Sequence, residues 1–103
     1  MIDRDALLAW PFEEKVQHYT ERDTMLYALS LGFGEDPMDA AQLHHVIQPN
    51  LQAFPTMALV LAHPGPWTGD PATGIDRAKV VHGEQMLTVH APLPASGWEC
   101  SGL

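Results

Sequence analysis

The sequence predicts one small domain of the α+β class, in which helices and strands occupy separate stretches. The chain has 103 residues, of which 46% are hydrophobic, and these values fit a single folded domain near the lower size limit for a well-buried core. Residues 19–34 carry the signals of a helix, and residues 79–91 alternate as a strand does.

The clearest helix is predicted over Tyr19 to Gly34, which reads YTERDTMLYALSLGFG. Thr20 can accept a hydrogen bond from the backbone of Asp23, whose carboxylate can reach back as in a capping box. Few polar residues follow, so we expect this helix to be buried on most sides. Gly32 and Gly34 can end it with positive φ.

Three weaker elements follow this helix. Leu43–Gln48 alternates as a short strand would. Pro55–Ala62 is apolar and begins with a proline, which suits the first position of a helix, so we predict a short buried helix there. His63–Gly74 is too rich in proline and glycine for regular structure and forms a long loop around Trp67.

The best strand is predicted over Lys79–Ala91, which places the odd positions from 81 to 89 on one face. Pro92 and Pro94 end it. The last residues, from 95 onward, match no pattern that we can place.

Charge and cysteine content exclude several classes of protein. The net charge is −8, with five Lys and Arg against thirteen Asp and Glu, which argues against nucleic acid and an anionic membrane surface as partners. Cys100 is the single cysteine, so no internal disulfide forms and we expect a cytoplasmic protein. The N-terminus lacks the pattern of a secretory signal, and the longest apolar run is too short to span a bilayer.

The strongest candidate for chemistry in the residues alone is the pair His82 and Glu84. On one strand face they would lie roughly 7 Å apart and could act as an acid/base pair. The alternative is that both solvate the exposed face of a structural strand, because catalysis also needs a third group and a cleft. No metal-ligand spacing, phosphate loop or dinucleotide fingerprint occurs, so we expect neither a metal nor a cofactor.

A candidate binding groove lies around the long loop. Phe54, Met57 and Trp67 flank it and could line an apolar groove, although such residues more often pack in a core. Arg77 and Lys79 are the close basic pair of the second half and are candidates for phosphate contacts. These five residues are the predicted substrate-binding residues.

Three motifs occur in order along the chain: YTERDTMLYALSLGFGEDP, FPTMALVLA and KVVHGEQMLTVHAPLP. Together they resemble the N-terminal, non-catalytic half of the hydratase 2 or MaoC-like dehydratase family, which includes the hydratase part of peroxisomal multifunctional enzyme type 2. The resemblance implies a lead-in over residues 1–18, a MaoC-like hot-dog domain over 19–97 and a tail over 98–103. Its fold would be a single hot-dog half, a curved antiparallel sheet around a central helix formed by residues 55–62, and here an incomplete one.

The same resemblance implies a lyase function in fatty acid metabolism, the reversible hydration of a trans-2-enoyl-CoA to the (3R)-hydroxyacyl-CoA. The family's catalytic Asp and His lie in a DxNPxHxD motif of the other half, which this sequence lacks, so no catalytic residue carries over to it. HGEQ resembles a strand segment of the non-catalytic half, which favours a structural role for His82 and Glu84. An incomplete sheet predicts a homodimer or association with a catalytic hydratase half.

Three functional hypotheses therefore stand side by side. The chain is the substrate-side half of a hydratase and inactive alone, with an acyl-CoA thioester as its ligand. Alternatively, it is a non-catalytic acyl-CoA-binding or subunit-association module. In the third hypothesis, a homodimer brings His82 and Glu84 together as an active single hot dog.

Overall fold

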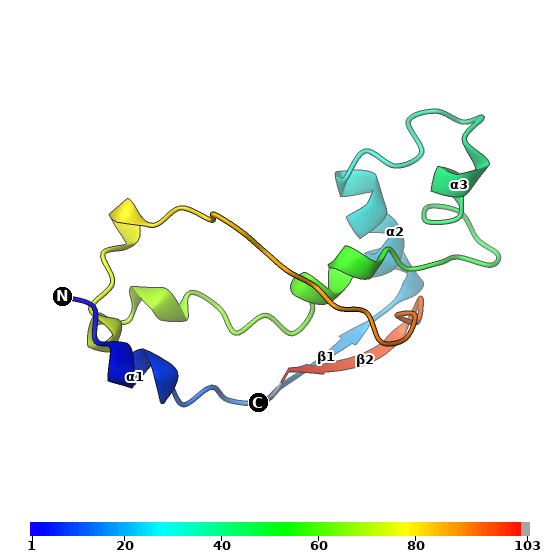
Figure 1. Cartoon of the computed structure of the whole chain (residues 1–103). Helices are drawn as coiled ribbons and strands as arrows, with labels where there is room; N and C mark the ends of the chain where they lie inside the picture. Colours follow the sequence, from blue (N-terminus) through cyan, green and yellow to red (C-terminus); the bar gives the residue numbers. More distant parts are fainter. Residues whose placement is uncertain (102–103) are drawn as a thin grey trace.

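The computed structural model describes residues 1–101 and shows an elongated molecule of 52 × 27 × 21 Å (Figure 1). Its helices and strands are α1 (Arg4–Leu8), β1 (Lys15–Tyr19), α2 (Glu21–Ser30), α3 (Ala40–Leu43) and β2 (Gly97–Ser101). Short 3₁₀ helices are η1 (Pro55–Leu59), η2 (Trp67–Gly69), η3 (Pro71–Thr73) and η4 (Arg77–Lys79). The sheet, α2 and α3 lie at one end, and α1 with η2–η4 lies at the other.

The sheet pairs two strands from opposite ends of the chain. β1 and β2 run antiparallel, with Lys15 opposite Ser101 and Tyr19 opposite Gly97. His18 lies opposite Trp98, and their rings contact each other across the strands in a tilted arrangement with centroids 4.7 Å apart. The sequence analysis predicted neither strand, because five residues are too few to show the alternation of polar and apolar residues that marks a strand.

The predicted capping box at the start of α2 is confirmed. The Asp23 carboxylate accepts hydrogen bonds from the backbone N–H of Thr20 at 2.8 Å and from its hydroxyl at 3.2 Å. After the helix ends, Gly32 and Gly34 have φ of +91° and +86°, as expected.

The expectation that this helix is buried on most sides is wrong. Only Thr24 and Ala28 are buried along α2, whereas Leu26 and Leu29 are 51% and 53% exposed. The physical reason is that α2 packs against β1 with one face, and within residues 1–101 no second layer covers the opposite face.

The small core forms where η1 meets the sheet. Tyr19, Met57 and Leu61 are buried together, with Tyr27 and Leu93 packed against them. The predicted helix over residues 55–62 is present only as the shorter 3₁₀ helix η1, which begins at Pro55 as expected. Within the predicted span, Met57, Leu61 and Ala62 are buried, whereas Leu59 and Val60 are 36% and 52% exposed, so the expectation of a buried helix holds only for part of it.

The strand predicted over residues 43–48 is wrong. Asp39 caps α3 by accepting a hydrogen bond from the backbone N–H of Gln42 at 3.2 Å. The backbone N–H groups of Val46 and Ile47 then donate back to the carbonyl of Leu43, both at 3.1 Å. These local bonds use the donors that a strand would offer to a neighbour.

The strand predicted over residues 79–91 is also wrong. Lys79 ends η4, and residues 80–91 are exposed and form no strand. They run as the orange segment of Figure 1 from η4 toward the sheet. Their alternating pattern is real, but a strand also needs a hydrogen-bonded neighbour, and no strand of the described chain lies beside this one.

The molecule exposes more surface than a compact monomer. Its radius of gyration is 17.0 Å, against about 13 Å for a compact domain of this length. Its accessible surface is 7836 Å², against roughly 5,700 Å² for a compact monomer of this size. Large apolar side chains with substantial exposure include Leu26, Leu29, Leu31, Val60, Val81, Met86 and Trp98.

A two-stranded antiparallel sheet with a few short helices agrees with the predicted mixture of helix and strand. It is compatible with part of a hot-dog fold, in which a sheet packs against a central helix.

Candidate functional site

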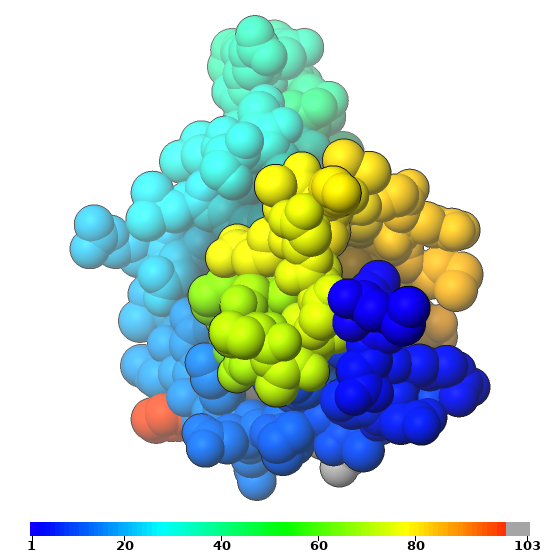
Figure 2. Space-filling model, turned by 90° about the vertical axis from the view of Figure 1, so that its left-hand side faces the viewer, coloured from blue at the N-terminus to red at the C-terminus, as the bar shows by residue number. Residues whose placement is uncertain are grey.

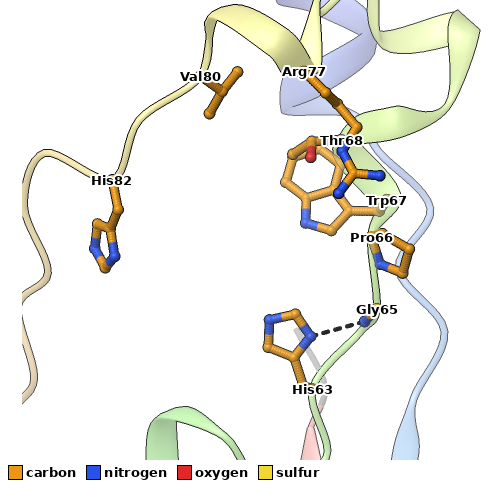
Figure 3. Close-up of a pocket in the computed structure, with 8 residues that line it drawn as sticks. All are labelled: His63, Gly65, Pro66, Trp67, Thr68, Arg77, Val80 and His82. Atoms are coloured by element: carbon orange, nitrogen blue, oxygen red, sulfur yellow. Dashed lines mark hydrogen bonds between the residues drawn. The ribbon is translucent and has the colours of Figure 1, made fainter.

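A pocket of about 630 Å³ lies between residues 63–68 and residues 77–82 (Figure 3). The loop from His63 to Thr68 forms one wall, and Val80 and His82 lie across the opening from it. Its lining consists of His63, Gly65, Pro66, Trp67, Thr68, Arg77, Val80 and His82.

Trp67 is held in this wall by aromatic residues from the N-terminal part of the chain. Its ring centroid lies 5.6 Å from that of Trp10 and 4.9 Å from that of Phe12. Both contacts are tilted or edge-to-face, which are favourable geometries for aromatic pairs. The N-terminal residues lie against the segment around residues 60–80 (Figure 2), where the backbone N–H of Asp3 donates to the carbonyl of Thr73 at 3.2 Å.

Arg77 enters the pocket from η4. Asp76 caps this turn by accepting a hydrogen bond from the backbone N–H of Ala78 at 3.1 Å. The Arg77 side chain then runs across Gly69, because a Cβ added at Gly69 would lie 2.7 Å from the Arg77 Cδ. Because Gly69 has no side chain, the Arg77 side chain can pass over it, and its guanidinium lies near Trp67 (Figure 3).

His63 presents a defined tautomer to the pocket. The backbone N–H of Gly65 donates to His63 Nδ1 at 3.0 Å, so Nδ1 is an acceptor and the ring proton of the neutral imidazole resides on Nε2. Figure 3 shows this second nitrogen directed away from the loop, toward the open side of the pocket. His63 thus offers an N–H donor to a ligand.

His82 and Glu84 do not form the pair that a shared strand face would bring together. His82 Nε2 lies 3.1 Å from the backbone carbonyl oxygen of Glu84, not from its carboxylate. Both residues are exposed and belong to the irregular segment after η4. The geometry that motivated an acid/base pair is therefore absent from this part of the chain.

The five predicted substrate-binding residues are divided among four places. Trp67 and Arg77 line the same pocket, and Lys79 ends η4 outside its lining. Phe54 packs with Phe33, with ring centroids 4.8 Å apart, in an aromatic cluster that includes His45. Met57, 2% exposed, lies in the core.

His63 lines this pocket but is not among the five substrate-binding residues predicted from the sequence. The signal available for it was weak, namely a histidine at the start of the proline-rich and glycine-rich loop. Whether any of these residues binds substrate stays a prediction.

Two further features of the described chain bear on the site. Within residues 1–101, no group of three or more His, Cys, Asp or Glu side chains could hold a metal ion. Across the same residues, the helices are all too short or too polar to cross a bilayer.

Comparison with known proteins gives one family match and several relatives. Residues 17–101 match the family model described as MFE-2 hydratase 2 N-terminal domain. The chain is 34% identical to "Enoyl-CoA hydratase ChsH3" of Mycobacterium tuberculosis, over 93% of this chain and 35% of that protein. It is 33% identical to "Enoyl-CoA hydratase 2, peroxisomal" of Arabidopsis thaliana, over 91% of this chain and 33% of that protein.

A further relative is "Peroxisomal multifunctional enzyme type 2" of Mus musculus, which is 31% identical over 77% of this chain and 11% of its own length. The chain thus spans about a third of the length of the two hydratases, with 35% and 33% of them covered, and a smaller part of the multifunctional enzyme.

Proposed function

Because this chain belongs to the family of MFE-2 hydratase 2 N-terminal domains, we propose that it is the substrate-side half of a (3R)-specific enoyl-CoA hydratase and is inactive alone. The reaction of the complete enzyme would be reversible addition of water to a trans-2-enoyl-CoA. The observation that carries this proposal is the continuous match of residues 17–101 to an N-terminal domain. Relatives named as enoyl-CoA hydratases support it.

The proposed fold is one half of a double hot dog, with η1 as the beginning of its central helix. The packing of Met57 and Leu61 from this region against Tyr19 of β1 supports that assignment. In this proposal the two-stranded sheet is the part of the hot dog that forms within the chain, and further strands come from a partner.

The proposed lack of activity rests on the chemistry of the site. Hydration needs a positioned base and acid that share one water molecule and the substrate. His82, the leading candidate, contacts a backbone carbonyl instead of the carboxylate of Glu84. This contact supports the part of the proposal that assigns the acid/base groups to another half.

The proposed partner is a catalytic hydratase half or a second copy of the chain. The surface in excess of a compact monomer, roughly 2,100 Å², is comparable to the total area buried in a stable protein interface. Leu26 and Leu29 form an exposed apolar face on α2, and we propose that the partner buries this face.

The test uses the purified chain and a medium-chain trans-2-enoyl-CoA. We expect no loss of the absorbance of the conjugated thioester, but a rise in melting temperature with ligand concentration, because a ligand that binds only the folded state stabilises it. Stereospecific turnover by the chain alone would contradict the proposed inactivity. An unchanged melting temperature at millimolar ligand would contradict acyl-CoA binding.

Co-purification with a separately expressed catalytic hydratase half distinguishes the proposed role from that of an independent binding module. We expect the two to elute together and to hydrate the enoyl-CoA faster than the catalytic half alone. Separate elution with retained ligand binding would favour the independent module.

A further inference from the structure

We propose that the pocket between residues 63–68 and 77–82 binds the phosphorylated adenosine end of the acyl-CoA thioester. The choice of this ligand rests on the proposed function. This end of the ligand carries an aromatic base and phosphate groups. The pocket offers an aromatic wall for the base, and a positive charge and an N–H donor for a phosphate.

The aromatic wall is the indole of Trp67. Trp10 and Phe12 pack against this ring, so its position is set before a ligand arrives and less freedom is lost on binding. Trp67 is half-buried and lines the pocket, so part of its surface faces the cavity. Every nucleic acid base has a π-face that can stack on such a ring.

The charge of the lining favours an anion. Arg77 brings a permanent positive charge, and none of the eight lining residues is acidic, although the chain has thirteen Asp and Glu against five Lys and Arg. A guanidinium can bind phosphate oxygens through two parallel N–H donors. The Nε2–H of His63 adds a hydrogen-bond donor for a phosphate oxygen.

The pocket has a volume suited to a small ligand. Its volume of about 630 Å³ falls within the range of small-molecule sites, roughly 300–1,000 Å³. Trp67 and Arg77 come from separate 3₁₀ helices and meet there, with the Arg77 chain running over Gly69. A base on Trp67 would therefore place an attached phosphate near the guanidinium.

The experiment measures binding of adenosine 3′,5′-bisphosphate by calorimetry, with inorganic phosphate as a second probe. We expect the bisphosphate to bind the wild-type chain, and Arg77→Gln to weaken this affinity about tenfold or more. Arg22→Gln is the matched control, because Arg22 is an exposed arginine on α2, which contributes no residue to the pocket. Trp67→Leu should weaken the bisphosphate but not inorganic phosphate.

A parallel measurement compares a medium-chain acyl-CoA with the matching acyl-pantetheine, which lacks the nucleotide. We expect the acyl-CoA to bind more tightly, and Arg77→Gln to remove that difference. Equal affinities for the two thioesters in the wild type would overturn this inference and leave the proposed function standing. Failure of both thioesters to bind would contradict the proposed function itself.

Two other outcomes would also overturn the inference. One is an equal loss of bisphosphate affinity in Arg77→Gln and Arg22→Gln, which would show a general charge effect. The other is equal affinity for inorganic phosphate and the bisphosphate, since a site that stacks the base must prefer the nucleotide. Circular dichroism of each variant verifies that the fold is retained.

Discussion

The hydroxyl of Tyr19 donates a hydrogen bond of 2.7 Å to the backbone carbonyl of Pro94, a residue 75 positions later in the chain. Beside it, the hydroxyl of Thr24 donates to the carbonyl of Ala95, also at 2.7 Å. Both hydroxyl-bearing residues are 1% exposed. Together they hold the segment that precedes β2 against β1 and α2, and so place β2 for pairing.

Tyr19→Phe removes one of these bonds while it keeps the ring in the core. We expect a loss of about 0.5–1.5 kcal/mol in the free energy of unfolding, the usual net value of an intramolecular hydrogen bond. Urea denaturation measures it. Tyr27→Phe is a matched control in which the hydroxyl lost is bonded to Thr56 at 2.8 Å, away from β2. If the Tyr19 bond places β2, Tyr19→Phe but not Tyr27→Phe should speed amide exchange in residues 97–98.

Met57→Ala tests whether Met57 belongs to the core or to a binding groove. Met57 is 2% exposed and packs with Tyr19 and Leu61, so we expect a loss of about 2–5 kcal/mol from the cavity left behind. Met86→Ala, at a side chain 82% exposed, should change the unfolding free energy by less than about 0.5 kcal/mol. A weaker acyl-CoA affinity for Met57→Ala with unchanged stability would instead place it in a groove.

Asp23→Ala removes the acceptor that serves both the backbone and the hydroxyl of Thr20. We expect the melting temperature to fall, by an amount that corresponds to about 1 kcal/mol for a helix cap. Arg22→Ala changes the neighbouring residue in the same turn and should have a smaller effect. Equal melting temperatures for Asp23→Ala and the wild type would mean that the cap contributes nothing to stability.

Gly69→Ala tests the path of the Arg77 side chain. The new Cβ would lie 2.7 Å from Arg77 Cδ, and the flexible side chain should move aside, so we expect a several-fold loss of affinity for adenosine 3′,5′-bisphosphate with little change in stability. Gly83→Ala is the matched control, because nothing lies within 4 Å of a Cβ there. Unchanged nucleotide affinity in Gly69→Ala would show that the position of Arg77 does not matter for binding.

Features that depend on a few neighbouring residues were predicted correctly from the sequence. The Thr20–Asp23 capping box, the positive φ of Gly32 and Gly34, and the proline at the start of η1 all follow from local geometry. The family resemblance also came from the sequence, because its three motifs occur in order, and the match of residues 17–101 confirms it.

Features that depend on distant residues were not predictable in the same way. Residues 79–91 alternate as a strand does, yet the strands that pair are 15–19 and 97–101. An alternating sequence shows which residues would share a face of a strand. It does not show whether a neighbouring strand is available for pairing. That information belongs to the whole chain.

The sequence by itself determined the family, the capping box of α2 with the two glycines after the helix, and the absence of a catalytic DxNPxHxD motif from these residues. Only the tertiary structure decided that Met57 is a core residue and that Trp67, Arg77 and His63 share a pocket. The physical reason is that capping and turn formation use bonds between near neighbours, whereas a pocket is formed by segments whose approach depends on every contact between them.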